Sequence, residues 1–329
     1  MNLPSTIRAA ADTLRDHGGQ ARAGGTDLTA RAGIGRTSGP FVDLRGVAEL
    51  RGSERRPDGS VRIGAMTTIA EIAADPLVTA GHPALAAAAA RLATPQIRTV
   101  ATLGGNLLQR NRCWYYRNPA FSCHQSGGQG CPARTGASLY SAVIDRGPCV
   151  APHPSSLAVA LLAYDATVRT HRLGVVPAAR IYGDGDDPTR DHLLEPDDVL
   201  IEVTLPPPAP SEGWAHHRAA ARAAAEWPLV EAVARVGRDG GRLTSVAVAV
   251  GGVARVPLRL PEVERAVLRD GEAPESLSAA AARVADSCSP LADNGYKVEL
   301  LRATVLEVLE QALAAPSAKA DVDTPAREG

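Results

Sequence analysis

Aromatic residues, cysteines and methionines are scarce in this chain of 329 residues, which has 3 tryptophans, 6 tyrosines, 2 phenylalanines, 5 cysteines and 2 methionines. Hydrophobic residues still make up 45% of the chain and charged residues 22%, which is ordinary for a globular protein. A chain of this length can form about two or three domains with sizeable cores. Because the scarce residue types are not needed to build such cores, any place where they gather is informative.

The chain also lacks a strong net charge and a long apolar run. Its net charge of −1 gives no overall field that would favour nucleic acid or an anionic membrane surface. The longest apolar stretches, PALAAAAARLA and SSLAVALLAY, are too short to span a bilayer, and the first residues lack the apolar core of a signal peptide. We therefore expect a cytoplasmic protein with no nucleic-acid partner and no membrane insertion. The alternative is export in folded form with a partner that carries a twin-arginine signal.

The scarce residues do gather in one place. Three cysteines and four aromatics lie in RCWYYRNPAFSCHQSGGQGC, residues 112–131; Cys149 follows, and only Cys288 is remote. In a reducing compartment such cysteines indicate a metal site or a catalytic thiol rather than a disulfide framework. Residues 112–149 show neither helical nor strand periodicity, and so long a loop is uncommon in a compact domain. Something other than a hydrophobic core must order it.

Elsewhere, periodicity and capping signals predict regular elements. Helices are expected over residues 5–17, 67–75, 83–93, 155–164, 275–288 and 295–315. Strands are expected over residues 40–44, 61–65, 166–170, 227–236 and 243–260, with a further strand ending at residue 205. A proline-rich linker at 206–212 is expected to separate a domain of residues 1–205 from a C-terminal domain of residues 213–315. The small, polar tail, 316–329, is expected to be disordered.

Two glycine segments have similar make-up: AGGTDL at 23–28 and TLGGNL at 102–107. In the first, Gly24 and Gly25 can adopt positive φ, so that consecutive N–H groups face one anion, and Thr26 adds a hydroxyl. The second is expected to be a loop that combines a hydroxyl, two glycines and an amide side chain. Either segment alone is more often a tight turn at a strand end, but the pair in one domain favours a pyrophosphate site. The Rossmann pattern G-x-G-x-x-G is absent.

Together with the later HPSSLAVALLAYDA, these segments resemble, in order and spacing, the FAD-binding subunit of the molybdenum hydroxylases. That family includes xanthine dehydrogenase, carbon monoxide dehydrogenase and aldehyde oxidoreductase. The segment RAAARAAAEWPLVEAVARV resembles the start of that subunit's C-terminal domain. The resemblance covers most of the chain and implies an α+β fold. Its FAD-binding domain would be of the vanillyl-alcohol-oxidase/PCMH type, with subdomains at about 1–55 and 56–205, followed by a smaller domain of antiparallel sheet and helices.

The resemblance implies that both glycine segments hold the FAD pyrophosphate. The implied contacts are Ala23, Gly24, Gly25, Thr26, Asp27, Leu28, Thr102, Gly104, Gly105 and Asn106. Two more implied contacts stand where this chain departs from the family. Ser156 occupies the place of an aspartate near the flavin ribose, and Arg218 the place of a frequent lysine. No catalytic residue is expected, because substrate oxidation in the family occurs on a partner subunit.

In most members of the family the second glycine segment passes almost directly into the segment around Ser156. In this chain residues 110–150 stand between the two. The gaps between the four clustered cysteines are nine, seven and seventeen residues. Flavin subunits of a periplasmic-type aldehyde oxidoreductase and of 4-hydroxybenzoyl-CoA reductase carry such an insert, and there it binds a [4Fe–4S] cluster. NLLQRNRCWYYRN looks closer to the aldehyde oxidoreductase form. The resemblance thus implies four metal ligands: Cys113, Cys123, Cys131 and Cys149.

The residue types agree, because four thiolates match the four corners of a cubane cluster. Nearby arginines could offset its negative charge, and nearby aromatics could shield it from water: Arg110, Arg112, Arg117, Arg134 and Arg146; Trp114, Tyr115, Tyr116 and Phe121. A zinc site, two disulfides or a catalytic cysteine remain alternatives, although zinc sites usually contain C-x₂₋₄-C pairs. His124 is a possible further ligand, and His153 is expected to pack near the flavin segment. Cys288 is expected to be a small residue of a C-terminal helix.

These observations predict the FAD- and [4Fe–4S]-containing electron-transfer subunit of a heterotrimeric molybdenum hydroxylase. The implied partners are a large subunit with the molybdenum cofactor, a small subunit with [2Fe–2S] clusters, and an external electron acceptor. Alternatives are a 4-hydroxybenzoyl-CoA reductase-like or xanthine dehydrogenase-like flavin subunit, a stand-alone flavin oxidase or reductase, and a zinc-stabilised binding module without a redox role.

Overall fold

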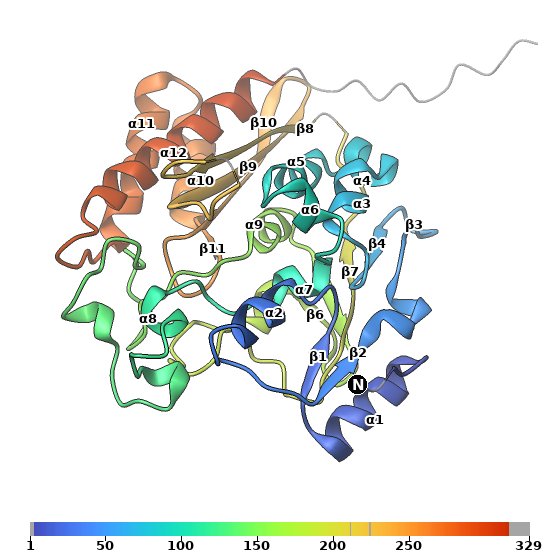
Figure 1. The fold of residues 1–329 in the computed structure, drawn as a ribbon. Coiled ribbons are helices and arrows are strands. Elements are labelled where there is room, and N and C mark those ends of the chain that lie inside the picture. Colours follow the sequence, from blue (N-terminus) through green and yellow to red (C-terminus); the bar gives the residue numbers. More distant parts are fainter. Residues whose placement is uncertain (1–2, 211, 224, 316–329) are drawn as a thin grey trace, which may run out of the picture.

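Three β-sheets and the helices packed on them make up the fold (Figure 1). The computed structural model describes residues 3–210, 212–223 and 225–315. The expected disordered tail, 316–329, lies outside the described residues. The mixture of helices with mainly antiparallel sheets confirms the α+β fold. Within the described ranges, no helix is both long and apolar enough to cross a membrane.

The N-terminal region carries a two-stranded parallel sheet. Its elements are α1 (Ile7–His17), β1 (Gln20–Arg22), α2 (Thr26–Ala32) and β2 (Phe41–Asp43). Thr6 begins α1 by accepting a hydrogen bond from the Ala9 N–H, as an N-cap should. The helix buries Ala10 and Leu14 in a core that also contains Val42. The predicted helix over 5–17 and strand over 40–44 are therefore confirmed, with shorter ends.

A five-stranded antiparallel sheet, in the order β3-β4-β7-β5-β6, forms the middle of the molecule. Its strands are β3 (Ser53–Arg55), β4 (Val61–Gly64), β5 (Thr167–Thr170), β6 (Gly174–Pro177) and β7 (Leu200–Leu205). Val203 of β7 lies opposite Ile63 of β4 on one side and Val168 of β5 on the other. All three side chains are buried, so the register of the central strands follows the apolar face.

Helices of the middle region carry clear capping signals. They are α3 (Ile69–Ala74), α4 (Pro76–Gly81), α5 (Pro83–Arg91), α6 (Pro95–Arg98), α7 (Leu103–Leu107), α8 (Trp114–Arg117) and α9 (Ser156–Ala163). Thr68 and Glu71 form a capping box at the start of α3. Every residue of α9 is buried, because α5 covers one side of it and the C-terminal sheet the other. Continuous burial explains why the SSLAVALLAY segment is apolar all round.

The C-terminal region is a four-stranded antiparallel sheet with helices on one face (Figure 1). Its elements are β8 (Glu212–Ala219), β9 (Val230–Asp239), β10 (Arg242–Gly251), β11 (Leu258–Arg259), α10 (Pro261–Asp270), α11 (Pro274–Ala282) and α12 (Tyr296–Ala314). Leu301, Val305 and Leu309 form the buried stripe of α12, which lies on β8 and β9. Strand β8 and helix α10 were not among the predicted elements.

Short 3₁₀ turns complete the described secondary structure. They are Leu44–Gly46, Ala48–Leu50, His124–Ser126, Pro132–Arg134, Ala178–Ile181 and Arg283–Ser287. The last of these replaces the end of the helix predicted over 275–288. Cys288 follows it, and its thiol donates to the Val284 carbonyl at 3.3 Å. Cys288 therefore packs against the C-terminal core as a small residue, but it lies just after this helical stretch and not within a helix as expected.

The segment that joins the two larger sheets packs against both sides. Residues 206–209 form neither helix nor strand, and the Pro206 carbonyl lies 2.8 Å from Nε2 of His82. Val233 of β9 and Ala249 of β10 share one hydrophobic core with Val159 of α9. The proposed boundaries at residues 205 and 213 thus lie within a region of continuous packing, and they stay a prediction.

Residues 110–150 form an irregular excursion around α8, drawn in green in Figure 1; we call them the cysteine segment. Its own core is small and contains the buried Ala133, Ala142 and Val150. Its end is held by α12 and the loop before it: the Asn294 side chain donates to the Ala142 carbonyl at 2.9 Å, and Lys297 Nζ to the Ser141 carbonyl at 3.1 Å. The segment therefore has some apolar packing, contrary to the expectation of none.

Candidate functional site

A cavity of about 670 Å³ opens between the N-terminal region and the middle sheet, and its size suits an organic ligand. Three stretches of chain form its walls. They contribute Ala23, Gly24, Gly25, Thr26, Asp27, Leu28 and Arg31; Thr102, Gly104, Gly105, Gln109 and Arg110; and Arg190, His192, Leu194, Glu195 and Leu200. Both predicted glycine segments thus face the same space.

The first wall turns from β1 into α2 at Gly25. Gly25 has φ +75°, the left-handed region that glycine tolerates best. Gly24 does not, so the expectation of positive φ is correct for only one of the pair. Gly24 is needed for space, because a Cβ there would lie 2.0 Å from the Val100 carbonyl oxygen. The first N–H groups of α2, which follow directly, have no acceptor inside the helix and can bind an anion.

The second wall is a short helix, not the loop we expected. Thr102 caps α7 by accepting from the Gly105 N–H at 3.2 Å. Gly104 and Gly105 are helical and do not have positive φ. A Cβ on Gly104 would lie 3.1 Å from the Ala65 carbonyl, and one on Gly105 would lie 3.1 Å from Thr102 Oγ1. Both glycines therefore permit close packing rather than an unusual backbone angle.

The third wall, residues 190–200, was missed. Its stretch DHLLEPDD has neither glycines nor a periodic pattern, so only its charges and histidine could have drawn attention. The charged residues that line the whole cavity are four arginines and three carboxylates: Arg31, Arg36, Arg110 and Arg190; Asp27, Glu195 and Asp198. Burial lowers the pKa of His192 to about 4, so this side chain is neutral at pH 7. The fixed positive charge of the cavity comes from guanidinium groups, which suit a diphosphate.

A second, small pocket lies in the cysteine segment. Its lining includes Cys113, Cys123, Cys131 and Cys149 together with Tyr115, Tyr116, His124 and Gln125. The fold thus gathers all four clustered cysteines, and none of the five cysteines is in a disulfide. Among the described residues, no three His, Cys, Asp or Glu side chains form a group that could hold a single metal ion.

Hydrogen bonds from the backbone reach the thiols. Burial raises the pKa of Cys113, and the N–H groups of Tyr115 and Tyr116 partly oppose that effect. A hydrogen bond from the Cys149 thiol lowers the pKa of Cys131 to about 5 and raises the pKa of Cys149. Thiolates that accept backbone N–H groups in a partly buried pocket have the chemistry of a metal-thiolate centre.

The cavity and the cysteine pocket share a wall. Tyr116 and Gln125 line both spaces. Tyr116 is 4% exposed, and the guanidinium carbons of Arg36, Arg110 and Arg117 lie 5.9, 5.8 and 5.7 Å from its ring centroid. A group in the cavity and a group in the cysteine pocket would therefore be neighbours, separated by side chains of the cysteine segment.

Comparison with known proteins decides the family. A family model described as "FAD binding domain in molybdopterin dehydrogenase" matches residues 1–208. A second, described as "CO dehydrogenase flavoprotein C-terminal domain", matches residues 215–314. The chain belongs to the FAD-binding subunits of the molybdopterin dehydrogenases. Its fold is accordingly the two-domain FAD-binding fold of the vanillyl-alcohol-oxidase/PCMH type, as expected.

Relatives of this FAD-binding subunit span nearly its whole length. The aldehyde oxidoreductase FAD-binding subunit PaoB of Escherichia coli (strain K12) is 32% identical over 322 residues, which cover 95% of this chain and 97% of that protein. The putative xanthine dehydrogenase FAD-binding subunit XdhB of the same organism is 28% identical over 284 residues, or 85% and 83% of the two chains. A solved carbon monoxide dehydrogenase from Hydrogenophaga pseudoflava superposes with a TM-score of 0.74, at 25% identity, over 95% of this chain and 96% of that one.

Three residues expected to touch FAD do not line the cavity. Asn106 accepts a hydrogen bond from Ser155 Oγ at 2.6 Å and so ties α7 to the start of α9. Ser156 is buried within α9. Arg218, on β8, donates to the Glu226 carbonyl at 2.8 Å. Flavin contacts by Asn106, Ser156 and Arg218 stay predictions. The contacts expected of residues that line the 670 Å³ cavity, which we call the flavin cavity, also stay predictions.

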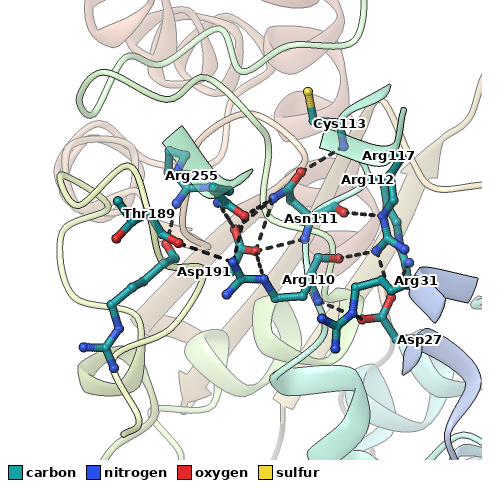
Figure 2. A network of polar contacts seen from close by, with 12 residues as sticks. Asp27, Arg31, Arg110, Asn111, Arg112, Cys113, Arg117, Thr189, Asp191 and Arg255 are labelled. Atoms are coloured by element: carbon teal, nitrogen blue, oxygen red, sulfur yellow. Dashed lines mark hydrogen bonds and ion pairs between the residues drawn. The ribbon is translucent and has the colours of Figure 1, made fainter. Parts of the chain in front are cut away.

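Two carboxylates, the buried Asp191 and the half-buried Asp27, connect the cysteine segment to its surroundings (Figure 2). Asp191 accepts from Arg255 at 2.8 Å, from Arg110 at 3.1 Å and from the Asn111 N–H at 3.1 Å. Burial raises the pKa of Asp191, but the two guanidinium groups outweigh burial and hold it well below the ordinary value. Asp27 of α2 is held in the same way by arginines of the cysteine segment, including Arg112 at 2.5 Å.

The residues expected to surround a cluster are only partly in that position. Trp114 is 45% and Phe121 42% exposed, so they shield little, whereas Tyr115 and Tyr116 line the cysteine pocket. The exposed Arg134 pairs with Asp145 at 2.9 Å, and Arg146 is also exposed. Arg110, Arg112 and Arg117 are ion-paired with Asp27 or Asp191. His153 is buried edge-on against Tyr182, their ring centroids 4.5 Å apart.

Proposed function

We propose that this chain is the FAD- and [4Fe–4S]-containing electron-transfer subunit of an aldehyde-oxidising molybdenum hydroxylase. It would pass electrons from a molybdenum-cofactor large subunit and a [2Fe–2S] small subunit through FAD to an external acceptor. The observation that carries the proposal is the shared wall of Tyr116 and Gln125 between the flavin cavity and the pocket lined by all four clustered cysteines. Two redox groups on either side of that wall would be close neighbours.

The flavin cavity fits FAD in volume and in charge. The first N–H groups of α2 and the guanidinium groups of Arg31, Arg110 and Arg190 would bind the pyrophosphate. Gly24 and Gly105 let the two glycine walls pack closely around this space, because a Cβ would meet the Val100 carbonyl oxygen at 2.0 Å at the first position and Thr102 Oγ1 at 3.1 Å at the second. When bound, FAD supplies one- and two-electron redox chemistry, and the protein supplies its position and electrostatic surroundings.

The cysteine pocket fits a cluster better than a single metal ion. A zinc ion holds its four ligands at about 2.3 Å, so their sulfurs must converge closely. In the described residues no such group exists, although all four clustered cysteines line one pocket. A cubane cluster separates the sulfurs more widely, because each thiolate binds a different corner. The ligands in this proposal are Cys113, Cys123, Cys131 and Cys149.

The substrate class and the partners come from the relatives. PaoB, 32% identical over nearly the full length, is named an aldehyde oxidoreductase FAD-binding subunit. We infer the same role here. Aldehyde oxidation takes place on the large subunit, and this chain transfers the electrons to the external acceptor. Its location in the cytoplasm, and the domain boundaries at residues 205 and 213, are parts of the same proposal.

A metal and flavin analysis of the complex tests this function. The chain is produced together with the proposed large and small subunits, and purified without oxygen. We expect one FAD and about four irons assigned to this chain beyond those of the small subunit. Its spectrum should combine flavin bands with a broad iron–sulfur shoulder. One zinc ion in place of the extra irons would refute the redox role of the cysteine pocket, and absence of FAD would refute the flavin assignment.

A further inference from the structure

The carboxylate of Asp27 is surrounded by donors. Its Oδ1 accepts from Arg112 at 2.5 Å and from Arg117 at 2.8 Å. Its Oδ2 accepts from Arg31 at 3.1 Å and from the Arg110 backbone N–H at 3.2 Å. Burial opposes ionisation of Asp27, but the two arginines on Oδ1 outweigh it, and the pKa lies below the ordinary value. The side chain is thus a charged, saturated junction rather than a free ligand (Figure 2).

Asp27 joins two parts of the chain that are far apart in sequence. It is the second residue of α2, whose N-terminus lines the flavin cavity. Three of its four donors come from the cysteine segment, on either side of Cys113. A further link lies in the turn after the helix, where Arg36 donates to the carbonyls of Asn118 and Phe121, both at 2.7 Å. The Arg36 N–H in turn donates to the Arg31 carbonyl of α2 at 2.8 Å, so the cysteine segment contacts the start of α2 and the turn that follows it.

The first part of the cysteine segment, around the first three cysteines, has little regular structure to order it. The regular structure of the whole segment is the single turn of α8 and two 3₁₀ turns, its own core has three buried residues, and only near its end do Val143 and Ile144 pack into the C-terminal core. A segment with so little apolar burial depends on metal–thiolate bonds to offset its ordering entropy. The positions of Arg110, Arg112 and Arg117 around Cys113 then depend on whether the four cysteines hold their metal.

We propose that Asp27 is a positioning residue that couples metal occupancy of the cysteine pocket to flavin binding, so that each favours the other. This inference rests on the proposed function, since it needs both groups to bind. The coupling is reciprocal, as for any two linked binding equilibria. Metal in the pocket fixes the arginines, the arginines fix Asp27, and Asp27 fixes the N-terminus of α2 against the flavin phosphates.

The test measures FAD affinity with and without metal in the pocket. Flavin is removed from the purified complex and titrated back, with binding followed by quenching of FAD fluorescence. The metal-free form is the Cys123→Ser complex, whose iron content is measured in parallel. We expect FAD to bind roughly 5- to 150-fold more weakly without the metal, the usual range for coupled sites.

The decisive variant is Asp27→Asn, which keeps the shape of the side chain and removes its charge. In Asp27→Asn, FAD affinity should fall, and it should no longer change when Cys123→Ser is added; this is a double-mutant cycle. Arg117→Gln removes a partner of Asp27 in the cysteine segment and should likewise make FAD affinity independent of the metal. It replaces Asp27→Asn in the test if that variant does not fold. The matched control is Asp145→Asn, which breaks the ion pair with Arg134 in the same segment but does not touch α2.

The outcomes separate this inference from the proposed function. Wild-type complex without iron in the cysteine pocket would refute the proposed function. Wild-type complex that binds both groups, but with FAD affinity unchanged by loss of the metal, would overturn only the coupling. Coupling that persists in both Asp27→Asn and Arg117→Gln would show that another route, not Asp27, carries it.

Discussion

The flavin cavity and the cysteine segment lie side by side but are built in opposite ways. The α7 wall of the cavity is capped by Thr102 and buries Leu103 and Leu107 in the central core, so hydrophobic burial holds its shape. The cysteine segment has a core of three residues of its own and relies further on thiols, arginines, the buried Asp191 and the half-buried Asp27. The α7 wall should therefore keep its form without FAD, while the cysteine segment should depend on the proposed cluster.

Loss of a clustered cysteine should have the largest effect, because it removes a ligand from the site that orders its segment. Each of four variants, Cys113→Ser, Cys123→Ser, Cys131→Ser and Cys149→Ser, is expected to lose the roughly four irons assigned to this chain, as assayed in the purified complex, and to open residues 110–150 to limited proteolysis. Cys288→Ser is the control and should keep all its iron, since its thiol bonds the Val284 carbonyl instead. Full iron in the four variants would mean that the ion pairs alone order the segment.

The five-stranded sheet lies beside the flavin cavity, and its contribution to the free energy of unfolding should fall in acid. Glu202 of β7 accepts from Arg56 at 2.6 Å, Arg62 at 2.8 Å and Arg169 at 3.1 Å. Burial raises its pKa, but the three arginines outweigh burial and lower it to about 2 from the ordinary 4.5. Its stabilisation, on the order of 3 kcal/mol, is present above about pH 4.5 and is lost as pH falls toward 2.

Glu202→Gln should therefore lower the free energy of unfolding at pH 7 by that amount and leave it nearly unchanged near pH 2, as measured by urea titration. The control is Glu54→Gln, whose carboxylate is 63% exposed and lies 4.0 Å from Arg62. An equal effect of Glu202→Gln at both pH values would contradict the linkage.

Gly24→Ala should affect flavin but not iron. The new Cβ would lie 2.0 Å from the Val100 carbonyl oxygen, and such overpacking costs about 1–3 kcal/mol. Binding of FAD, measured by fluorescence titration, should weaken about tenfold or more. Gly33→Ala is the matched control, because its Cβ would meet the Thr29 and Ala30 carbonyls at an ordinary 3.5 and 3.8 Å. Equal flavin affinity in the two variants would refute the close-packing role of Gly24.

The smallest effect is expected at Phe121. Its side chain is 42% exposed, so Phe121→Leu should change the free energy of unfolding by no more than about 0.5 kcal/mol and leave iron and flavin in place. Tyr116→Leu is the contrasting change, because Tyr116 is buried between the two sites. We expect it to loosen both groups, as judged by iron and flavin content. Loss of iron from Phe121→Leu alone would restore the shielding role first expected for that ring.

Much of the fold was predictable because its signals are local. The capped starts of α1 and α3, and the apolar run that became α9, are written within a few neighbouring residues. The second glycine segment was misjudged as a loop, because two adjacent glycines disfavour a helix by propensity alone. The Thr102 cap and packing against Ala65 override that preference. Strand β8 was missed since EGWAHHRA mixes charged and small residues, and its pairing with β9 decides it.

By itself, the sequence determined the family, the two glycine segments and the four clustered cysteines, since these depend on residue type and spacing along the chain. Only the tertiary structure decided that residues 190–200 close the cavity and that Tyr116 and Gln125 divide it from the cysteine pocket. It also decided that Asp27 pairs with Arg112, 85 residues away, and that Asp191 accepts from Asn111 across 80 residues. An ion pair needs only opposite charges brought close together out of water, so nothing local in the chain marks its partners.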